Sequence, residues 1–325
     1  MRRIPLYPLI DYWESPGIQE WTRWFGRDAP MVVEIGFGRG ETLVQRACDH
    51  PDWNIVGIEI AWASIQRALR RIHHAGISNI RIVYANADWA LYYLWPAESV
   101  HTVWSLFPDP WPKARHIAHR LFSRRFFLRM NRILVPGGQV HCVTDAESFV
   151  RWVLDQYPET GFRITHRTYR NTVQFGTKYE QKWLRAGRTF HWLTFTKTRT
   201  LPYPEPPWPE NMRTYRWTGT FQPDDLTWPE KVVDSDVVLV FKETLWDAHR
   251  HVYMIKVIIR EDTFLQKVWL ELRNIGTIWR LAPSDGCKFV PTYGLQRALD
   301  VAAEVISRIS TLHASSSKVQ CTDEI

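Results

Sequence analysis

The stretch Met31–Gly40 reads MVVEIGFGRG and carries the clearest structural signal in the chain. Its first five residues form a short, mostly apolar run of the kind that makes a buried strand. Glycines at the alternate positions 36, 38 and 40 follow, and a helical pattern begins at Glu41. Glycine reaches backbone conformations that side chains forbid, so a strand, a glycine turn and a helix in this order indicate a nucleotide-binding unit.

Strand and helix patterns alternate through the first two thirds of the chain. Strands are predicted at residues 31–35, 54–60, 79–84, 100–107, 139–144, 162–167 and 189–196, and helices at 41–49, 61–74, 88–94, 123–134 and 145–156. This alternation predicts an α/β fold, a mainly parallel Rossmann-like sheet with helices on both faces.

A proline-rich segment then interrupts the pattern. Residues 201–209 read LPYPEPPWP, which predicts a stiff linker. Beyond it, strands at 237–242, 251–260, 266–273 and 277–281 and a helix at 293–312 predict a small α+β domain with an antiparallel sheet. The serine-rich tail from Ala314 is predicted to be disordered. We therefore expect a domain of residues 1–199, a linker of residues 200–211 and a second domain of residues 212–325, with a structural or docking role favoured for the last.

The bulk composition is that of a globular chain of 325 residues, 45% hydrophobic and 23% charged. No apolar run reaches the roughly 18 residues that a membrane span needs, and the N-terminus shows no signal-peptide pattern. The four cysteines lack CxxC spacing and the histidines lack ligand spacing. We therefore expect no membrane partner, no metal and a reducing, cytoplasmic location.

Positive charge is concentrated in the first part of the chain. The net charge is +7; residues 1–211 hold 27 Lys and Arg against 19 Asp and Glu, whereas residues 212–325 hold 14 against 15. The segment from Pro110 to Thr144 has no acidic residue but seven cations: Lys113, Arg115, Arg120, Arg124, Arg125, Arg129 and Arg132. Such runs are usually solvated faces, but beside a candidate active-site loop they favour a polyanionic substrate.

That loop is Phe107–Lys113, which reads FPDPWPK. Prolines on both sides of Asp109 stiffen the backbone around a carboxylate, and an aromatic ring, Trp111, lies beside it. The loop follows a predicted strand, and the C-terminal ends of strands are where open α/β sheets place ligands. On this loop alone, a proline-rich turn with a capping Asp is about equally well supported.

The glycine turn is spaced GxGxG and follows an acidic residue, Glu34. A dinucleotide turn reads GxGxxG, and a carboxylate so close would repel a pyrophosphate. It suits a cationic ligand such as S-adenosylmethionine. Glu59 ends the second predicted strand, where it can bond ribose hydroxyls. Asn86 and Ala87 follow the third strand and are expected to face the adenine; Asp88 is a less favoured alternative.

Taken together, these segments resemble the tRNA (guanine-N7)-methyltransferase family. The matching segments are Val33–Gly40, Gly57–Ile60, Phe107–Lys113, Pro136–Gly138, Thr144-Asp145 and Thr177–Glu180, in the family's order between about Met31 and Lys197. The FPDPWPK segment is highly specific, whereas the glycine turn is not. The resemblance implies a class I methyltransferase fold and transfer of a methyl group from S-adenosylmethionine to N7 of a tRNA guanine, at position 46 of the variable loop.

The resemblance also implies roles for individual residues. It implies cofactor contacts from Glu34, Gly36, Gly38, Glu59, Asn86, Ala87 and Asp109, and it makes Asp109 the catalytic residue. It implies substrate contacts from Lys113, Asp145, Thr177, Lys178, Tyr179 and Glu180, and tRNA contacts from Arg115, His116, His119 and Arg120. This chain departs from the family in having Asn86 where Asp is frequent. It also has Ala114, Ile117 and Ala118 within a segment that is usually more basic.

The chemistry that these residues suggest is one of positioning. Guanine N7 is a nucleophilic lone pair that carries no proton, so alignment matters more than a strong base. We expect Asp109 and Glu180 to accept hydrogen bonds from guanine N1–H and the exocyclic amine, and Trp111 either to stack on the purine or to pack. Arginines 124, 125, 129 and 132 are expected to share in holding tRNA.

Three other functions compete with this interpretation. An exocyclic-amine methyltransferase would carry an Asp/Asn-Pro-Pro-aromatic loop, but Asp109-Pro110-Trp111 lacks the second proline. The glycine spacing disfavours a nicotinamide-dependent oxidoreductase. A non-catalytic RNA-binding protein on the same fold would not need Asp109, Lys113, Asp145 and Glu180 together. The oligomeric state, a homodimer included, stays open.

Overall fold

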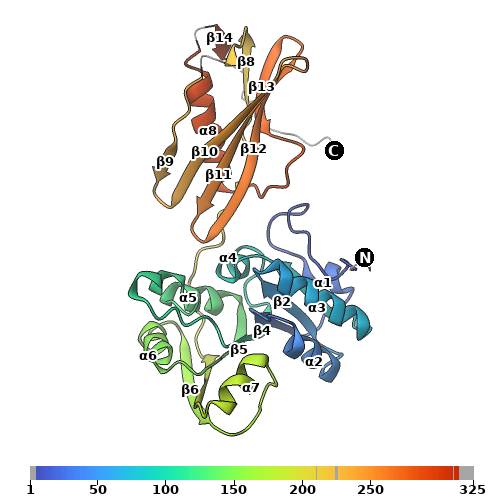
Figure 1. Cartoon of the computed structure of the whole chain (residues 1–325), viewed down its shortest axis with the longest axis vertical. Coiled ribbons are helices and arrows are strands. Elements are labelled where there is room, and N and C mark those ends of the chain that lie inside the picture. Colours follow the sequence, from blue (N-terminus) through green and yellow to red (C-terminus); the bar gives the residue numbers. More distant parts are fainter. Residues whose placement is uncertain (1–4, 210, 224–225, 310, 315–325) are drawn as a thin grey trace. The chain divides into compact units, whose positions relative to one another are not determined.

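The computed structural model of the chain describes residues 5–209, 211–223, 226–309 and 311–314 (Figure 1). It divides into two compact units. The first comprises Met1–Tyr12 and Gly17–Glu205, and the second comprises Trp13–Pro16 and Pro206–Ile325. No helix among the described residues is long and apolar enough to cross a membrane.

The first unit is built on a seven-stranded sheet in the order β3-β2-β1-β4-β5-β7-β6. The strands are β1 (Met31–Ile35), β2 (Asn54–Glu59), β3 (Ile80–Tyr84), β4 (Val100–Leu106), β5 (Leu134–Thr144), β6 (Phe162–Tyr169) and β7 (Phe190–Lys197). The β1–β5 pairings are parallel, and β7 runs antiparallel to both of its neighbours. All five residues of the interior strand β1 are buried, as expected for a sheet covered on both faces. The predicted mainly parallel fold is confirmed.

The helices that follow the strands lie close to their predicted ranges. They are α2 (Glu41–Asp49), α3 (Trp62–His74), α4 (Ala87–Tyr93), α5 (Arg124–Ile133) and α6 (Glu147–Gln156). The short helix α1 (Trp21–Phe25) precedes β1, and two further short elements were not predicted: the 3₁₀ helix η1 (Ala114–His119) and α7 (Lys178–Arg185). Strand β5 also begins earlier than predicted, because the segment Pro136–Gly138 lies within it.

The second unit has its own antiparallel seven-stranded sheet, in the order β14-β8-β13-β12-β11-β10-β9. Its strands are β8 (Tyr215–Gly219), β9 (Lys231–Asp234), β10 (Val237–Asp247), β11 (Val252–Glu261), β12 (Phe264–Ile275), β13 (Ile278–Pro283) and β14 (Leu312–Ala314). The helix α8 (Tyr293–Ile306) contacts β10, β11 and β13 and shares one apolar core with the sheet (Figure 1). The α+β prediction is confirmed, although β8, β9 and β14 were missed and α8 ends before residue 312. The predicted disorder begins at Ala314, which is instead the last residue of β14; the rest of that tail, residues 315–325, lies outside the described part.

The first residues of the proline-rich segment pack as part of the first unit. Leu201 donates its backbone N–H to Asn131 Oδ1 at 2.8 Å, and Tyr92 donates its hydroxyl to the carbonyl of Glu205 at 3.0 Å. The Glu205 carboxylate pairs with Arg132. Residues 201–205 therefore belong to the first unit rather than to a free linker.

Candidate active site

The three glycines of the turn after β1 differ in their surroundings: two face open space and the third is tightly packed. Gly36, Gly38 and Gly40 have φ of 66°, 56° and 77°, a region that L side chains rarely adopt. A Cβ on Gly36 or Gly38 would meet no atom within 4 Å, whereas one on Gly40 would lie 2.9 Å from the Cβ of Ala68. Close packing of α2 on α3 therefore requires Gly40, and the backbone at Gly36 and Gly38 faces space in which a ligand can lie.

Glu34 lies behind this turn and is only 1% exposed. It accepts a hydrogen bond from the Thr42 hydroxyl, and Arg46 Nε lies 3.8 Å from its Oε2. Burial raises the pKa of the Glu34 carboxyl, while the charge of Arg46 opposes that rise. No described residue donates a hydrogen bond to Glu34 Oε2, so a buried acceptor remains available beside the turn.

The acidic residue at the end of β2 is joined to the same turn. Glu59 Oε2 accepts the backbone N–H of Gly38 at 3.0 Å, and Oε1 accepts those of Ile60 and Ala61 at 2.8 and 3.0 Å. This carboxylate thus fixes the glycine turn against the end of β2, in the place where a ribose contact was expected.

Asn86 lies after β3 as the N-cap of α4, and Ala87 is the first residue of that helix. The Asn86 side-chain oxygen accepts the backbone N–H groups of Asp88 and Trp89 at 3.0 and 3.3 Å. Capping uses the amide oxygen and leaves the NH₂ group to donate. The alternative, Asp88, is buried and pairs with Arg129 at 2.7 Å and Arg125 at 3.2 Å. The Asp88 carboxylate is thus engaged with α5.

These residues fit a cationic nucleoside cofactor such as S-adenosylmethionine. The turn at Gly36 and Gly38 faces open space, Glu34 keeps a buried acceptor without a hydrogen-bond partner, and Asn86 keeps an amide donor. The elements that carry them, β1, β2 and β3, are neighbours in one parallel sheet. Their carboxyl ends therefore lie along one edge, where ligands bind to open α/β sheets.

Asp109 lies exposed in a loop whose backbone is held in an unusual shape. Phe107 and Trp111, on either side of it, have φ of 55° and 42°, which costs a non-glycine residue roughly 1–2 kcal/mol each. Arg120 holds the loop from behind: its Nε donates to the carbonyl of Pro110 at 2.9 Å and its Nη2 to that of Trp111 at 3.0 Å.

The predicted tRNA contact of Arg120 is not supported by this arrangement. Arg120 is only 9% exposed, and its guanidinium lies 5.1 Å from the ring centre of Trp152 on α6. The other predicted tRNA contacts lie on η1, where Arg115 and His119 are exposed. The rings of His116 and His119 each lie 5.4 Å from that of Trp111. Trp111 therefore packs on these histidines, one of the two arrangements expected for it.

Glu180 does not have the predicted freedom to contact a guanine. It is 0% exposed. Its Oε1 accepts the Tyr169 hydroxyl and the Gln174 N–H, both at 2.9 Å, and its Oε2 accepts the N–H groups of Phe175 and Gly176 at 2.9 and 2.8 Å. Four donors fill the acceptor positions of a carboxylate. The correction is that Glu180 fixes the loop that precedes α7.

Of the remaining predicted substrate residues, Lys113 is exposed at the end of the Asp109 loop, and the other four lie on or close to α7. Thr177 caps the helix by accepting the Glu180 N–H at 3.1 Å, and Lys178 and Tyr179 are exposed. Asp145, after β5, pairs with Arg188, a partner that the sequence analysis missed. The ring of Trp183 on α7 lies 5.5 Å from that of Phe107, so α7 packs against the start of the Asp109 loop.

A layer of aromatic and cationic side chains, also missed from the sequence, supports the loop before α7. The rings of Trp104 and His141 stack at 4.0 Å, Arg46 lies 4.2 Å from the Trp104 ring centre, and Phe175 lies 5.8 Å from Trp104. Burial, and secondarily the charges of Arg46 and Arg167, lowers the pKa of His141 to about 4. A neutral imidazole therefore lies at the centre of this layer.

Only part of α5 can form the tRNA-holding surface that the sequence predicted. Arg129 and Arg132 are each 4% exposed. Ion pairs engage the whole set: Arg129 and Arg125 with Asp88, Arg132 with Glu205, and Arg124 with Glu159. The buried Arg129 and Arg132 are therefore unavailable to tRNA, whereas Arg124 and Arg125 are exposed and a tRNA contact from them stays a prediction.

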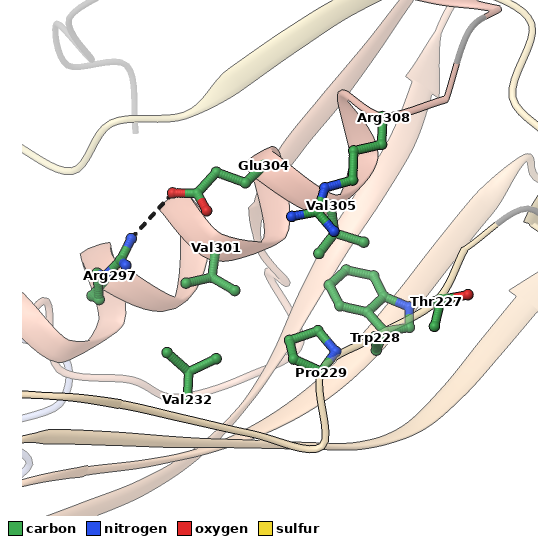
Figure 2. A pocket seen from close by; sticks show the side chains of 9 residues that line it. All are labelled: Thr227, Trp228, Pro229, Val232, Arg297, Val301, Glu304, Val305 and Arg308. Atoms are coloured by element: carbon green, nitrogen blue, oxygen red, sulfur yellow. Dashed lines mark hydrogen bonds and ion pairs between the residues drawn. The ribbon is translucent and has the colours of Figure 1, made fainter.

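A separate pocket of about 370 Å³ lies in the second unit, between α8 and the segment around Trp228 (Figure 2). Figure 2 shows Trp228, Pro229 and Val232 facing the α8 side chains, with Arg297 paired to Glu304 at 3.2 Å. None of the predicted site residues lines it. Within the described residues, no group of three or more His, Cys, Asp or Glu could hold a metal ion.

The sheet order, the glycine turn after β1 and the acidic residue ending β2 define a class I S-adenosylmethionine-dependent methyltransferase. Residues 28–193 match a family model described as "Putative methyltransferase". The tRNA (guanine-N(7)-)-methyltransferase of Thermus thermophilus is 34% identical over 251 residues, which cover 77% of this chain and 80% of that protein. The chain belongs to the tRNA (guanine-N7)-methyltransferase family.

Two further relatives with the same printed name differ in how far they match. The protein of Chlorobium phaeobacteroides is 39% identical over 177 residues, or 54% of this chain and 86% of its own. That of Thermotoga maritima is 30% identical over 296 residues, or 88% of each chain. The second match is longer than the first unit, so it extends into the second. The family resemblance therefore reaches beyond Lys197 in some relatives, further than the sequence motifs indicated.

Proposed function

We propose that this protein transfers the methyl group of S-adenosylmethionine to N7 of a guanine in tRNA, and that guanine 46 of the variable loop is the target. One observation supports this most directly. Strands β1 and β4 are parallel neighbours, with Ile35 opposite Ser105. The glycine turn and the Asp109 loop therefore leave adjacent strands at the same edge of the sheet, which brings a cofactor site next to a substrate site.

On the cofactor side, the backbone of Gly36 and Gly38 would approach the ligand, and the buried Glu34 Oε2, beside Arg46, would accept from its ammonium group. Glu59 keeps the turn in place and has a lone pair on Oε2 left for a ribose hydroxyl. The free amide of Asn86, next to Ala87, donates to the adenine. When bound, S-adenosylmethionine supplies an electrophilic methyl group on a sulfonium.

On the substrate side, Asp109 accepts hydrogen bonds from guanine N1–H and the exocyclic amine. The guanine becomes cationic as N7 gains the methyl group, so both donors become more acidic and their bonds to Asp109 strengthen toward the transition state. No proton leaves N7, so no general base is required. Lys113, Asp145 with its partner Arg188, Lys178 and Tyr179 surround the base. Thr177 and Glu180 act indirectly, by shaping the loop and the start of α7.

The test is to incubate the protein with methyl-labelled S-adenosylmethionine and unmodified tRNA and to map the labelled base. Label at guanine N7 is expected. Label on an adenine or on an exocyclic amine would favour the exocyclic-amine reaction, and tRNA binding without label would favour a non-catalytic RNA-binding protein. A second tRNA, in which guanine 46 is replaced by another base, tests the position: it should receive no label if guanine 46 is the target.

The proposal also covers the location of the protein in the cell and its oligomeric state. We place the protein in the cytoplasm, because its substrate is tRNA and its cysteine pattern suits a reducing compartment. A homodimer remains a prediction, which sedimentation equilibrium tests.

A further inference from the structure

In the structure, several cations of the first unit that the sequence predicted to hold tRNA are buried or ion-paired. Arg120 lies behind the Asp109 loop, and the arginines of α5 are ion-paired. Of the seven cations between Pro110 and Thr144, Lys113 and Arg115 remain exposed and without an ion pair to any described residue. A tRNA is held largely through its phosphates, which requires several free cations on one face. Those cations have to come from another element.

Helix α7 carries such a face. Lys178, Lys182 and Arg185 are spaced i, i+4 and i+7, so they line one side of the helix. All three are exposed, and none pairs with an acidic group in the described part of the chain. The other side of α7 is engaged with the site, through buried Glu180 and the contact of Trp183 with Phe107.

A cleft of about 470 Å³ lies between this face and the start of α2. Lys178, Gln181, Lys182 and Arg185 line one wall, and Arg39 and Glu41 line the other. Glu41 is shared between Arg39 at 3.3 Å and Arg71 at 2.9 Å, so the cleft itself holds four cations and one already engaged carboxylate. Like charges four residues apart on a helix, such as Lys178 and Lys182, cost a few tenths of a kcal/mol unless an anion relieves them.

We propose that this cleft, the α7 cleft, binds the phosphate backbone of tRNA. The proposal rests on the proposed function and deepens it. Three cations that are unpaired among the described residues, together with Arg39, suit a polyanion better than a small hydrophobic ligand. Arg39 lies within the glycine turn and Lys178 follows the loop that Glu180 fixes. Phosphates held here therefore lie beside both halves of the methyl-transfer site and position the guanine relative to Asp109.

The experiment compares the double variant Lys182→Gln/Arg185→Gln with the control Arg67→Gln/Arg70→Gln. The control removes the same charge from exposed positions of α3 that carry no ion pair among the described residues. The affinity for unmodified tRNA is measured over a range of salt concentrations without S-adenosylmethionine. We expect the cleft variant to bind 10- to 100-fold more weakly, with a salt slope lower by about 1.5, and the control to bind within about twofold of the wild type.

Two outcomes overturn the proposal: wild-type affinity and salt slope in the cleft variant, or an equal loss in the control, which would show a general effect of charge. Thermal unfolding of both variants verifies their folding, and the charge reversal Lys182→Glu/Arg185→Glu must then weaken binding further. Because binding is measured without turnover, this test is independent of the methylation assay. Wild-type protein that binds tRNA through the cleft but leaves guanine N7 unlabelled would refute the proposed function alone.

Discussion

Arg120 donates its Nε hydrogen to the carbonyl oxygen of Pro110 at 2.9 Å. Pro110 is the residue that follows Asp109 in the sequence. The same guanidinium reaches the next carbonyl, that of Trp111, at 3.0 Å. A planar fork of donors can bridge two successive carbonyls, whereas the single ammonium of a lysine cannot do so with the same geometry. Arg120 therefore sets the path of the loop, and its positive charge is secondary.

The variant Arg120→Lys keeps the charge and removes the fork. We expect kcat to fall about 10- to 100-fold because the reacting groups are misplaced, while tRNA affinity stays near that of the wild type. Single-turnover kinetics and a binding assay measure the two effects, with Arg151→Lys on the exposed face of α6 as the control. A normal kcat combined with weaker tRNA binding would restore Arg120 as a tRNA contact.

The variant Asp109→Ala tests the exposed carboxylate itself. We expect methyl transfer to fall to background and S-adenosylmethionine affinity to remain largely intact, because the loop path depends on backbone carbonyls and not on this side chain. Calorimetric titration of the cofactor and a labelled-methyl assay separate the two quantities. Asp109→Asn, which keeps the size but offers donors as well as an acceptor, should also be impaired. Lost cofactor binding with normal turnover per bound cofactor would refute the assignment.

The variant Glu180→Gln tests the role that the structure gives to this buried carboxylate. An amide NH₂ cannot accept from a backbone N–H, so at least one of the four donors loses its partner, at a cost of about 1–3 kcal/mol. Denaturant unfolding should show that loss, and trypsin should cleave faster at Arg170 in the loosened loop. Tyr169→Phe removes one of the four bonds and should cost less, about 1 kcal/mol. Wild-type stability and protection in Glu180→Gln, with methylation lost, would instead support a direct guanine contact.

The low pKa of His141 makes stability depend on pH. Between pH 6.5 and about 4 the unfolded chain binds a proton at this position that the folded chain excludes. The free energy of unfolding therefore falls as the pH falls through this window, by up to about 3 kcal/mol. His141→Gln should flatten this part of the profile, and the exposed His74→Gln should not. Parallel profiles for the wild type and His141→Gln would contradict the prediction.

The sheet of the first unit could be predicted because its signals are local. Apolar runs, alternating glycines and the Pro-Asp-Pro segment each lie within ten residues, and the structure puts β1 and α2 at the predicted bounds. Charge partners could not be predicted in this way. The arginines of α5 resemble the cations of α7 in sequence, but Arg129 meets Asp88, 41 residues earlier in the chain. Ion pairing, and for Arg129 and Arg132 also burial, distinguishes them, and both depend on the packed fold.

One missed element did leave a local signal. Thr177 and Glu180 have the T-x-x-E spacing that marks a helix start, and Thr177 caps α7. The family resemblance implies substrate contacts for these two residues, whereas in the structure Thr177 caps α7 and Glu180 holds the loop before it. Arg188, the partner of Asp145, left no comparable signal, because the two residues lie 43 positions apart.

Residues 13–16 pack with the second unit, so they can reach their final contacts only after that unit has been synthesised. The ring of Trp13 lies 6.0 Å from that of Phe264, and Glu14 pairs at 3.1 Å with Lys288, 274 residues later. At roughly 5–20 residues per second, a ribosome needs on the order of 10 to 50 seconds to supply that partner. The first unit can fold in that interval, while a short segment emerging near the N-terminus waits for almost the last part of the chain.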